Sequence, residues 1–207
     1  MSRELDFNEE ALALFARLGI DPSAQRSHAY NSMDCLFVEE KRGGRIFVGN
    51  QTAAHDLKSL TASNITHVVN CTHGMSAIPN YHPGSLQYFQ FQIADWSSIV
   101  KADDKSLERF VEPLWAFIDG ALGKGEGVLV HCLAGAHRAG TTGVACLMHY
   151  GGIRSVGEAI AAAKKVRPII DPIGRLPAFL ERLQRLEAAA TVATPAGGSK
   201  ASGGGAT

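Results

Sequence analysis

Residues 128–143 read VLVHCLAGAHRAGTTG, and this stretch decides the class of fold. The apolar run at 128–130, which follows Gly127, is typical of a short buried strand. Beyond the cysteine lie four uncharged, mostly small residues that permit a tight loop: Leu133, Ala134, Gly135 and Ala136. Residues 140–150 are mostly apolar, as in a buried helix. A loop between a strand and a helix can turn its N–H groups inward and bind an anion, aided by the helix dipole.

Two reactive side chains, Cys132 and Arg138, flank this loop with five residues between them. The planar guanidinium of arginine matches two phosphate oxygens. Cysteine thiols ordinarily have pKa values near ~8.5, but helix N-termini and nearby cations lower them to roughly 3.5–7.5. We therefore expect Cys132 to be a thiolate that attacks phosphorus while Arg138 holds the phosphoryl group. The alternative is an inert buried cysteine followed by an unrelated surface arginine.

The pattern His-Cys-five residues-Arg resembles the cysteine-based protein phosphatases, and specifically the compact dual-specificity branch. Residues 45–50 and 64–70 look like the early strands of that branch, and Arg167-Pro168 followed by residues 176–186 is similar to its end. The resemblance covers residues 30–188 or so. It implies a phosphomonoester hydrolase that works through phosphocysteine. In that reaction Cys132 is the nucleophile, Arg138 the phosphate clamp, and residues 133–138 the substrate-binding loop.

Hydrolysis of a phosphate ester also requires an acid, because the departing oxygen must be protonated. The resembling family takes this acid from an aspartate upstream of the cysteine. Residues 90–95 alternate like a strand that ends in an acid, so Asp95 is the candidate. Asp103 and Asp104 are rivals, because the stretch after Asp95 is longer than is usual in this branch. Asp104 is also placed to cap the helix that follows.

Two positions depart from the family pattern. Ala139 follows the arginine where most relatives carry Ser or Thr, whose hydroxyl stabilises the departing thiolate when phosphocysteine is hydrolysed. We expect a slower second step unless Thr141 or Thr142 compensates. Plant-type glucan phosphatases also carry Ala at this place. His137 stands where a small residue is usual, and it is either a titrating cation beside the phosphate or a rim residue that points to solvent.

Alternating strands and helices predict an α/β fold with a single, mostly parallel, twisted central sheet flanked by helices. Ligands of such sheets bind beyond the carboxyl ends of the strands, where the Cys132 loop is expected. Among the other elements we expect a helix at 53–60 and a strand at 86–93. The strand at 66–70 leads to Cys71, where some relatives place a cysteine that forms a disulfide with the nucleophile under oxidation. Cys71 is therefore either such a protecting thiol or a small core residue.

Three regions are expected along the chain. Residues 1–30 form an N-terminal helical extension, in which Asn8 caps a helix at 9–18 whose apolar stripe packs on the domain or, alternatively, binds a partner. Residues 31–189 form a catalytic domain like that of the dual-specificity phosphatases. Residues 190–207 are rich in Gly, Ser and Ala and are predicted to be a disordered tail.

The composition sets limits on partners and location. The chain has 207 residues, of which 45% are hydrophobic, enough for one well-buried core. Basic and acidic residues number 20 each, so we expect no nucleic-acid surface. No apolar run is long enough to span a membrane. Four cysteines without metal-type pairing favour a reducing, cytoplasmic location, with nuclear entry also open. We expect no metal or cofactor, and the oligomeric state is undetermined.

The leading functional hypothesis is dephosphorylation of phosphotyrosine and phosphoserine or phosphothreonine in proteins. A glucan phosphatase is an alternative because of Ala139, with Trp96 and Trp115 among the aromatic residues considered as platforms for sugar rings. The second alternative is a phosphate-binding pseudophosphatase with weak or no turnover. Phosphoinositides are less favoured because residues 133–136 carry no charge. Lys164, Lys165 and Arg167 either form a solvated helix face or dock an acidic substrate.

Overall fold

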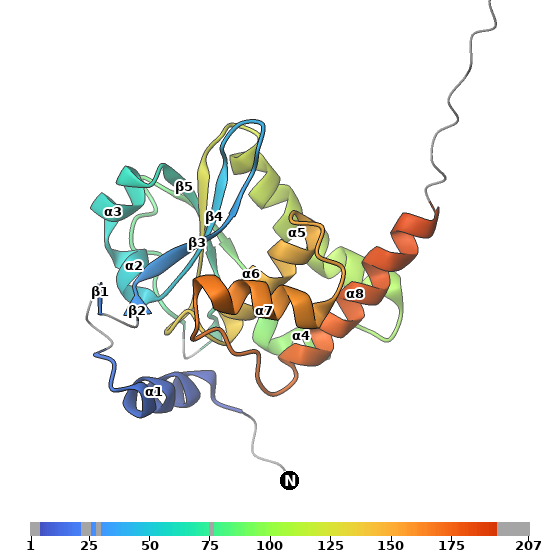
Figure 1. Cartoon of the computed structure of the whole chain (residues 1–207), viewed down its shortest axis with the longest axis horizontal. Helices are drawn as coiled ribbons and strands as arrows, with labels where there is room; N and C mark the ends of the chain where they lie inside the picture. The colour runs from blue at the N-terminus through green and yellow to red at the C-terminus, as the bar shows by residue number, and fades with distance from the viewer. Residues whose placement is uncertain (1–4, 22–25, 28–29, 75–76, 194–207) are drawn as a thin grey trace, which may run out of the picture.

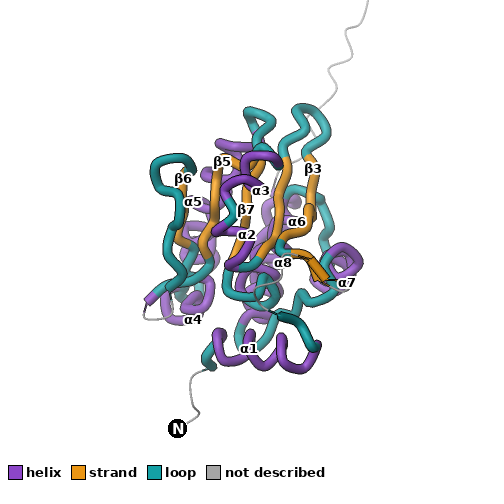
Figure 2. The backbone as a smooth tube through the Cα atoms, turned by 90° about the vertical axis from the view of Figure 1, so that its left-hand side faces the viewer, coloured by secondary structure: helices purple, strands orange, loops and turns teal. Residues whose placement is uncertain are grey.

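The computed structural model describes residues 5–21, 26–27, 30–74 and 77–193. Its main sheet has five strands in the order β3-β4-β7-β5-β6 (Figures 1 and 2). Their bounds are Met33–Val38 (β3), Arg45–Gly49 (β4), Ile65–Asn70 (β5), Gln87–Gln90 (β6) and Gly127–His131 (β7). The last four run parallel, and β3 pairs antiparallel with β4 at one edge. The predicted α/β fold with a mostly parallel sheet is confirmed.

Helices cover both faces of this sheet (Figures 1 and 2). One face carries two short helices, Gln51–His55 (α2) and Leu57–Ala62 (α3). The other carries four longer helices: Asp104–Leu122 (α5), Arg138–His149 (α6), Val156–Val166 (α7) and Leu176–Ala193 (α8). A 3₁₀ turn, Ile93–Asp95 (η2), and the short helix Trp96–Ile99 (α4) connect β6 to α5. A small ribbon, Arg26–Ser27 (β1) with Tyr30–Asn31 (β2), precedes the sheet.

The central strand β7 explains why residues 128–130 read as a continuous apolar run. Val128 and Val130 pack in the cluster formed with α5, α6 and α8, whereas Leu129 packs in the cluster formed with α2 and α3. All three side chains are fully buried. A strand covered on both faces has no side for polar residues, so alternation disappears. The strand therefore fixes the position of the loop that follows it.

The helix after the loop, α6, lies directly against the sheet. A Cβ atom added at Gly143 would come within 2.5 Å of the Val48 side chain, so only glycine allows this approach. Close packing of α6 on β4 holds the start of the helix, and with it Arg138, at the end of the sheet. Figure 2 shows a further helix, Phe7–Leu18 (α1), lying across that end of the molecule.

Several sequence-based expectations are corrected. The helix predicted at 53–60 is two helices, because Asp56 leaves the helical conformation and its side chain caps α3. The strand predicted at 86–93 ends at Gln90 and is followed by η2. The helix α8 includes residues 190–193 of the predicted tail, and 194–207 lie outside the described residues. The N-cap of α1 is Asp6, which accepts from two backbone N–H groups, and not Asn8.

Candidate functional site: an anion loop with a buried cysteine and arginine

The loop between β7 and α6 surrounds the sulfur of Cys132. This side chain is only 2% exposed, and the backbone N–H of Gly135 donates to its Sγ at 3.3 Å. Gly135 has a φ of +69°, and a Cβ there would meet the carbonyl oxygen of Gly49 at 2.5 Å. The loop therefore needs glycine at this position to bring an N–H group to the sulfur. That donor and the N-terminus of α6 both face the space around the sulfur, where an anion would be stabilised.

Arg138 is the first residue of α6 and is buried beneath α1. Its Nη2 donates to the Oδ1 of Asn8, and its guanidinium lies 5.5 Å from the centre of the Phe7 ring. Its Nε is buried and has no hydrogen-bond partner among the described residues. A buried N–H group without a partner costs free energy unless a ligand accepts from it. An anion beside Arg138 could accept from this Nε, and the role of Arg138 as a phosphate clamp stays a prediction.

A second arginine, which sequence reasoning placed on a basic surface, supports the loop from outside. Arg167 is 1% exposed, and it donates from Nε to the carbonyl of Gly135 at 2.9 Å and from Nη2 to that of Ala134 at 3.0 Å. Its Nη1 donates to the Asp34 carboxylate at 2.6 Å. These bonds turn the loop carbonyls outward, so the N–H groups can face inward. The prediction of a solvated or docking role is wrong for Arg167, whereas Lys164 is exposed beside Asp171.

Tyr30 adds to this support, and no feature of the sequence indicated it. Its hydroxyl donates to the carbonyl of Ala134 at 3.2 Å and accepts from the Asn50 side chain. The Arg167 guanidinium also lies 5.1 Å from the centre of the Tyr30 ring. Burial raises the pKa of Tyr30 above its ordinary value, so the hydroxyl keeps its proton. The loop carbonyls are therefore held by donors from several parts of the chain.

Asp95 ends η2 and lies at the mouth of the same site. A cavity of about 270 Å³ is lined by Leu5, Asp6, Phe7, His73, Ala94, Asp95 and Arg138. The Asp95 side chain is 42% exposed, and its Oδ2 is joined to His73 Nε2 by a hydrogen bond of 2.5 Å. Asp103 is instead exposed and caps α5 through a bond from the Ser106 N–H, and Asp104 is an exposed residue of its first turn. The helix cap predicted for Asp104 is therefore Asp103.

His73 contacts the candidate acid Asp95, and no feature of the sequence indicated this contact. It lies in the loop after β5, far from Asp95 in the sequence, and its ring is 20% exposed. Its Nδ1 is buried without a partner among the described residues, and its Nε2 is joined to Asp95. No local pattern distinguishes this histidine from the other loop histidines. The pairing arises because parallel strands bring the ends of β5 and β6 to one edge.

Of the two interpretations of His137, the structure contradicts the one that places it at the rim. It is 4% exposed, and its Nδ1 donates to the carbonyl of Asp171 at 2.7 Å, so it is not a rim residue pointing to solvent. Thr141 and Thr142 donate their hydroxyl protons to the carbonyls of His137 and Arg138, four residues earlier. A hydroxyl has a single proton, so neither is free to replace the one missing at Ala139.

Two buried groups beside the loop are held neutral. Burial lowers the pKa of His131 to about 4, and neither ring nitrogen has a partner among the described residues. Burial raises the pKa of Cys71 to about 12, and its Sγ lies 3.5 Å from the Thr142 hydroxyl. Cys71 is free, as are the other three cysteines, and its backbone N–H bonds to the carbonyl of His131. A redox role for Cys71 stays a prediction.

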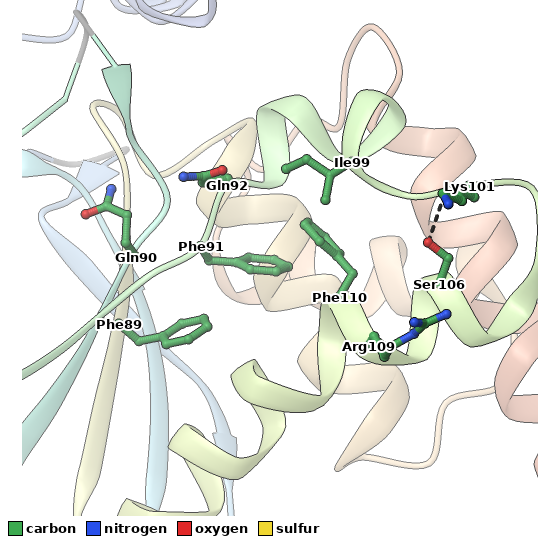
Figure 3. Close-up of a pocket in the computed structure, with 9 residues that line it drawn as sticks. All are labelled: Phe89, Gln90, Phe91, Gln92, Ile99, Lys101, Ser106, Arg109 and Phe110. Atoms are coloured by element: carbon green, nitrogen blue, oxygen red, sulfur yellow. Dashed lines mark hydrogen bonds between the residues drawn. The ribbon is translucent and has the colours of Figure 1, made fainter.

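A larger cavity of about 400 Å³ lies elsewhere, between the edge strand β6 and α5 (Figure 3). The rings of Phe89, Phe91 and Phe110 line it, and Lys101 and Arg109 lie at one side. None of its lining residues belongs to the Cys132 loop. Within the described residues, no group of three or more His, Cys, Asp or Glu side chains is arranged to hold a metal. No helix in the described ranges is long and apolar enough to cross a bilayer.

Comparison with known proteins gives one consistent family. Residues 46–185 match the family described as "Dual specificity phosphatase, catalytic domain". The chain is 30% identical to "Dual specificity protein phosphatase 1" of Arabidopsis thaliana over 142 residues, which are 69% of this chain and 65% of the plant protein. It is 35% identical to human "Dual specificity protein phosphatase 9" over 149 residues, 69% of this chain and 36% of the human protein. The chain thus spans less than two thirds of either relative.

Solved structures show the same fold. A human tyrosine phosphatase-like serine/threonine/tyrosine-interacting protein is 25% identical, with a TM-score of 0.59 over 77% of this chain and 97% of its own. Human DUSP28 is 23% identical, with a TM-score of 0.58 over 80% of this chain and 99% of its own. The match to the catalytic domain includes β4, β7, the anion loop and most of α8. This chain belongs to the dual specificity phosphatase family.

Proposed function

We propose that the protein is a phosphomonoester hydrolase that removes phosphate from phosphotyrosine and phosphoserine or phosphothreonine in proteins. One observation supports this most directly: Asp95 and Arg138 line a single cavity beside the loop that holds Cys132. In this proposal Asp95 is the acid, Arg138 the anion clamp and Cys132 the nucleophile. Membership of the family agrees with this reaction class.

The proposed first step is an in-line displacement at phosphorus. The Cys132 thiolate forms a bond to phosphorus while the bond from phosphorus to the ester oxygen breaks. Arg138 and the loop N–H groups hold the phosphoryl oxygens, whose charge they balance. Asp95 transfers its proton to the departing oxygen, so an alcohol or phenol leaves. His73 orients the carboxyl group through its hydrogen bond.

The proposed second step regenerates the enzyme. Asp95, now a carboxylate, accepts a proton from a water molecule that attacks the phosphocysteine. Inorganic phosphate leaves, and Cys132 returns to the thiolate. Ala139 offers no hydroxyl to that thiolate, so we expect this step to be slow. A slow second step makes the phosphoenzyme accumulate.

Protein substrates are favoured over glucans by the burial of the aromatic residues near the site. Trp96 is 5% exposed and Trp115 is 9% exposed, and Trp115 stacks on His149 at 4.4 Å between ring centres. Neither indole offers a free face on which a sugar ring can stack. Residues 133–136 carry no charge that would suit a polyphosphorylated headgroup.

We also propose a cytoplasmic location, supported by the four free cysteines.

The test is hydrolysis of a small aryl phosphate by the wild type and by Cys132→Ser and Asp95→Asn. We expect turnover by the wild type and its loss in Cys132→Ser. The second candidate is a phosphate-binding pseudophosphatase, favoured by Ala139. It would be supported if the wild type bound phosphopeptide but released no phosphate. Phosphopeptide, amylopectin and phosphoinositide, assayed side by side, separate the substrate classes.

A further inference from the structure

We infer that the first turn of α1 is a wall of the substrate site, and that Phe7 selects aryl phosphates, such as phosphotyrosine, over alkyl phosphates. This inference rests on the proposed phosphatase function and extends it to a residue outside the family domain at 46–185. From its apolar stripe alone, α1 is expected only to pack on the domain or to bind a partner.

The helix α1 is fixed on the outer side of the loop at residues 132–138. Its buried residues Ala11, Leu14 and Phe15 form one cluster with Ala134 and Ala136 of the loop. Phe15 also contacts Tyr30 edge to face, with 5.6 Å between the ring centres. Tyr30 in turn donates to the loop carbonyl of Ala134. The helix and the phosphate loop are therefore one packed unit.

The first turn of α1 contacts Arg138 through two side chains. Because Asp6 caps the helix, Asn8 falls in the first turn, and its side-chain oxygen accepts from Nη2 of Arg138. The Phe7 ring lies over the same guanidinium, 5.5 Å from centre to Cζ. Arg138 Nε remains buried and without a partner among the described residues. Asn8 thus holds the guanidinium while Nε is left for the phosphate, and Phe7 stands beside that position.

The same turn of α1 also lines the cavity beside Arg138. With α1 in place, a space of about 270 Å³ remains, and its lining includes Leu5, Asp6 and Phe7 together with His73, Ala94, Asp95 and Arg138. A phosphoryl group held by Arg138 must extend its ester oxygen toward Asp95. The group attached to that oxygen therefore passes along the wall formed by Phe7 and Leu5.

Ring contacts give this wall a chemical preference. A tyrosyl ring bonded directly to the ester oxygen would lie against Phe7, where aromatic pairs gain affinity beyond buried area. The seryl or threonyl group has one or two carbons at that depth and leaves most of the apolar wall wet. The preferred substrate is thus a phosphotyrosine side chain.

The experiment measures two phosphopeptides of identical flanking sequence, one with phosphotyrosine and one with phosphothreonine. Dissociation constants are measured in the Cys132→Ser background, and kcat/KM in the active enzyme. For the phosphotyrosine peptide, we expect Phe7→Ala to raise the dissociation constant and lower kcat/KM about tenfold. For the phosphothreonine peptide, both should change less than about threefold. Asn8→Ala should weaken both peptides alike, because Asn8 contacts the clamp that grips every phosphate.

Two variants guard the interpretation. Leu12→Ala is the matched control, because Leu12 lies on the same helix but is 54% exposed, and it should change neither peptide. Leu14→Asp removes a buried contact of α1 and should undock the helix. Binding of both peptides should then weaken because Asn8 is lost, and binding of the phosphotyrosine peptide should weaken more because Phe7 is lost too. If Phe7→Ala weakens both peptides equally, or neither, the inference is overturned. Absence of turnover in the wild type would refute the proposed function, while the binding ratio would still decide the role of Phe7.

Discussion

The loop at residues 132–138 (the anion loop) and the turn η2, which carries Asp95, form one site but are held in very different ways. The loop is buried, and the carbonyls of Ala134 and Gly135 accept from Arg167, with Tyr30 adding a further bond. Asp95 is 42% exposed and is held by a single histidine at 2.5 Å. In the proposed reaction the phosphate binds a buried frame, made of residues 132–138 with Arg167 and Tyr30, whereas the proposed proton donor Asp95 stays in contact with water.

This difference suits the two tasks. Preorganised dipoles stabilise charge without having to reorganise during the reaction. The acid must give up a proton in one step and regain one in the next, so access to water is useful to it. We therefore expect damage to the frame to affect folding and activity together, and damage at the turn to affect activity alone.

The largest expected effect comes from breaking the frame. Arg167→Met removes four donated hydrogen bonds and leaves Asp34 without its ion-pair partner. Loss of one partner of a buried pair typically costs about 3–5 kcal/mol, so we expect a fall of that size in the free energy of unfolding. Urea unfolding followed by fluorescence measures it. Lys164→Ala on α7, exposed beside Asp171, is the control and should cost under about 1 kcal/mol.

The next effect isolates the turn. Asp95→Asn should lower kcat about 10²–10³-fold for substrates whose leaving group needs a proton, because general acid catalysis is removed. Aryl phosphates with very acidic phenols should lose far less. Steady-state rates over a series of leaving groups measure this, and urea unfolding should remain unchanged. Asp103→Asn, which alters only an exposed cap, is the control; a loss there equal to that of Asp95→Asn would reassign the acid.

A third effect is the pH dependence of the free energy of unfolding that buried His131, next to Cys132, contributes. The pKa of His131 is lowered to about 4 in the folded protein, below the ordinary value of about 6.5 in the unfolded chain. As pH falls below 6.5 or so, the unfolded chain gains a proton that the folded protein refuses, so stability declines until about pH 4. The contribution is about 3 kcal/mol. His131→Leu should show a smaller decline between pH 7 and 4, and equal slopes in both proteins would contradict this.

The smallest effect concerns the second chemical step. Ala139→Ser places a hydroxyl at the start of α6, and a hydrogen bond to a charged group is worth enough to speed phosphocysteine hydrolysis about tenfold. Rapid-mixing kinetics should show a smaller initial burst and a faster steady state. Ala145→Ser, also buried in α6, adds a hydroxyl further along the helix and should not accelerate turnover. An unchanged burst in Ala139→Ser would show that another step limits the rate.

Sequence reasoning succeeded where structure is local. A strand, a glycine loop and a helix follow each other within 128–149, so backbone geometry alone places Cys132 and Arg138 around one anion site. It failed where a single residue changes its local role. Asp6 rather than Asn8 caps α1, and Asp103 rather than Asp104 caps α5, because neighbouring polar residues compete for one cap and their patterns are nearly equal.

The sequence by itself determined the sheet class and the loop that carries Cys132 and Arg138, since both depend on residues close together in the chain. The roles of nucleophile, clamp and acid stay predictions. Only the tertiary structure decided that Arg167 is buried beneath the loop, that His73 holds Asp95, and that α1 closes one side of the cavity. The physical reason is that these contacts join distant segments, and a charged or aromatic side chain carries no local mark of whether packing will bury it.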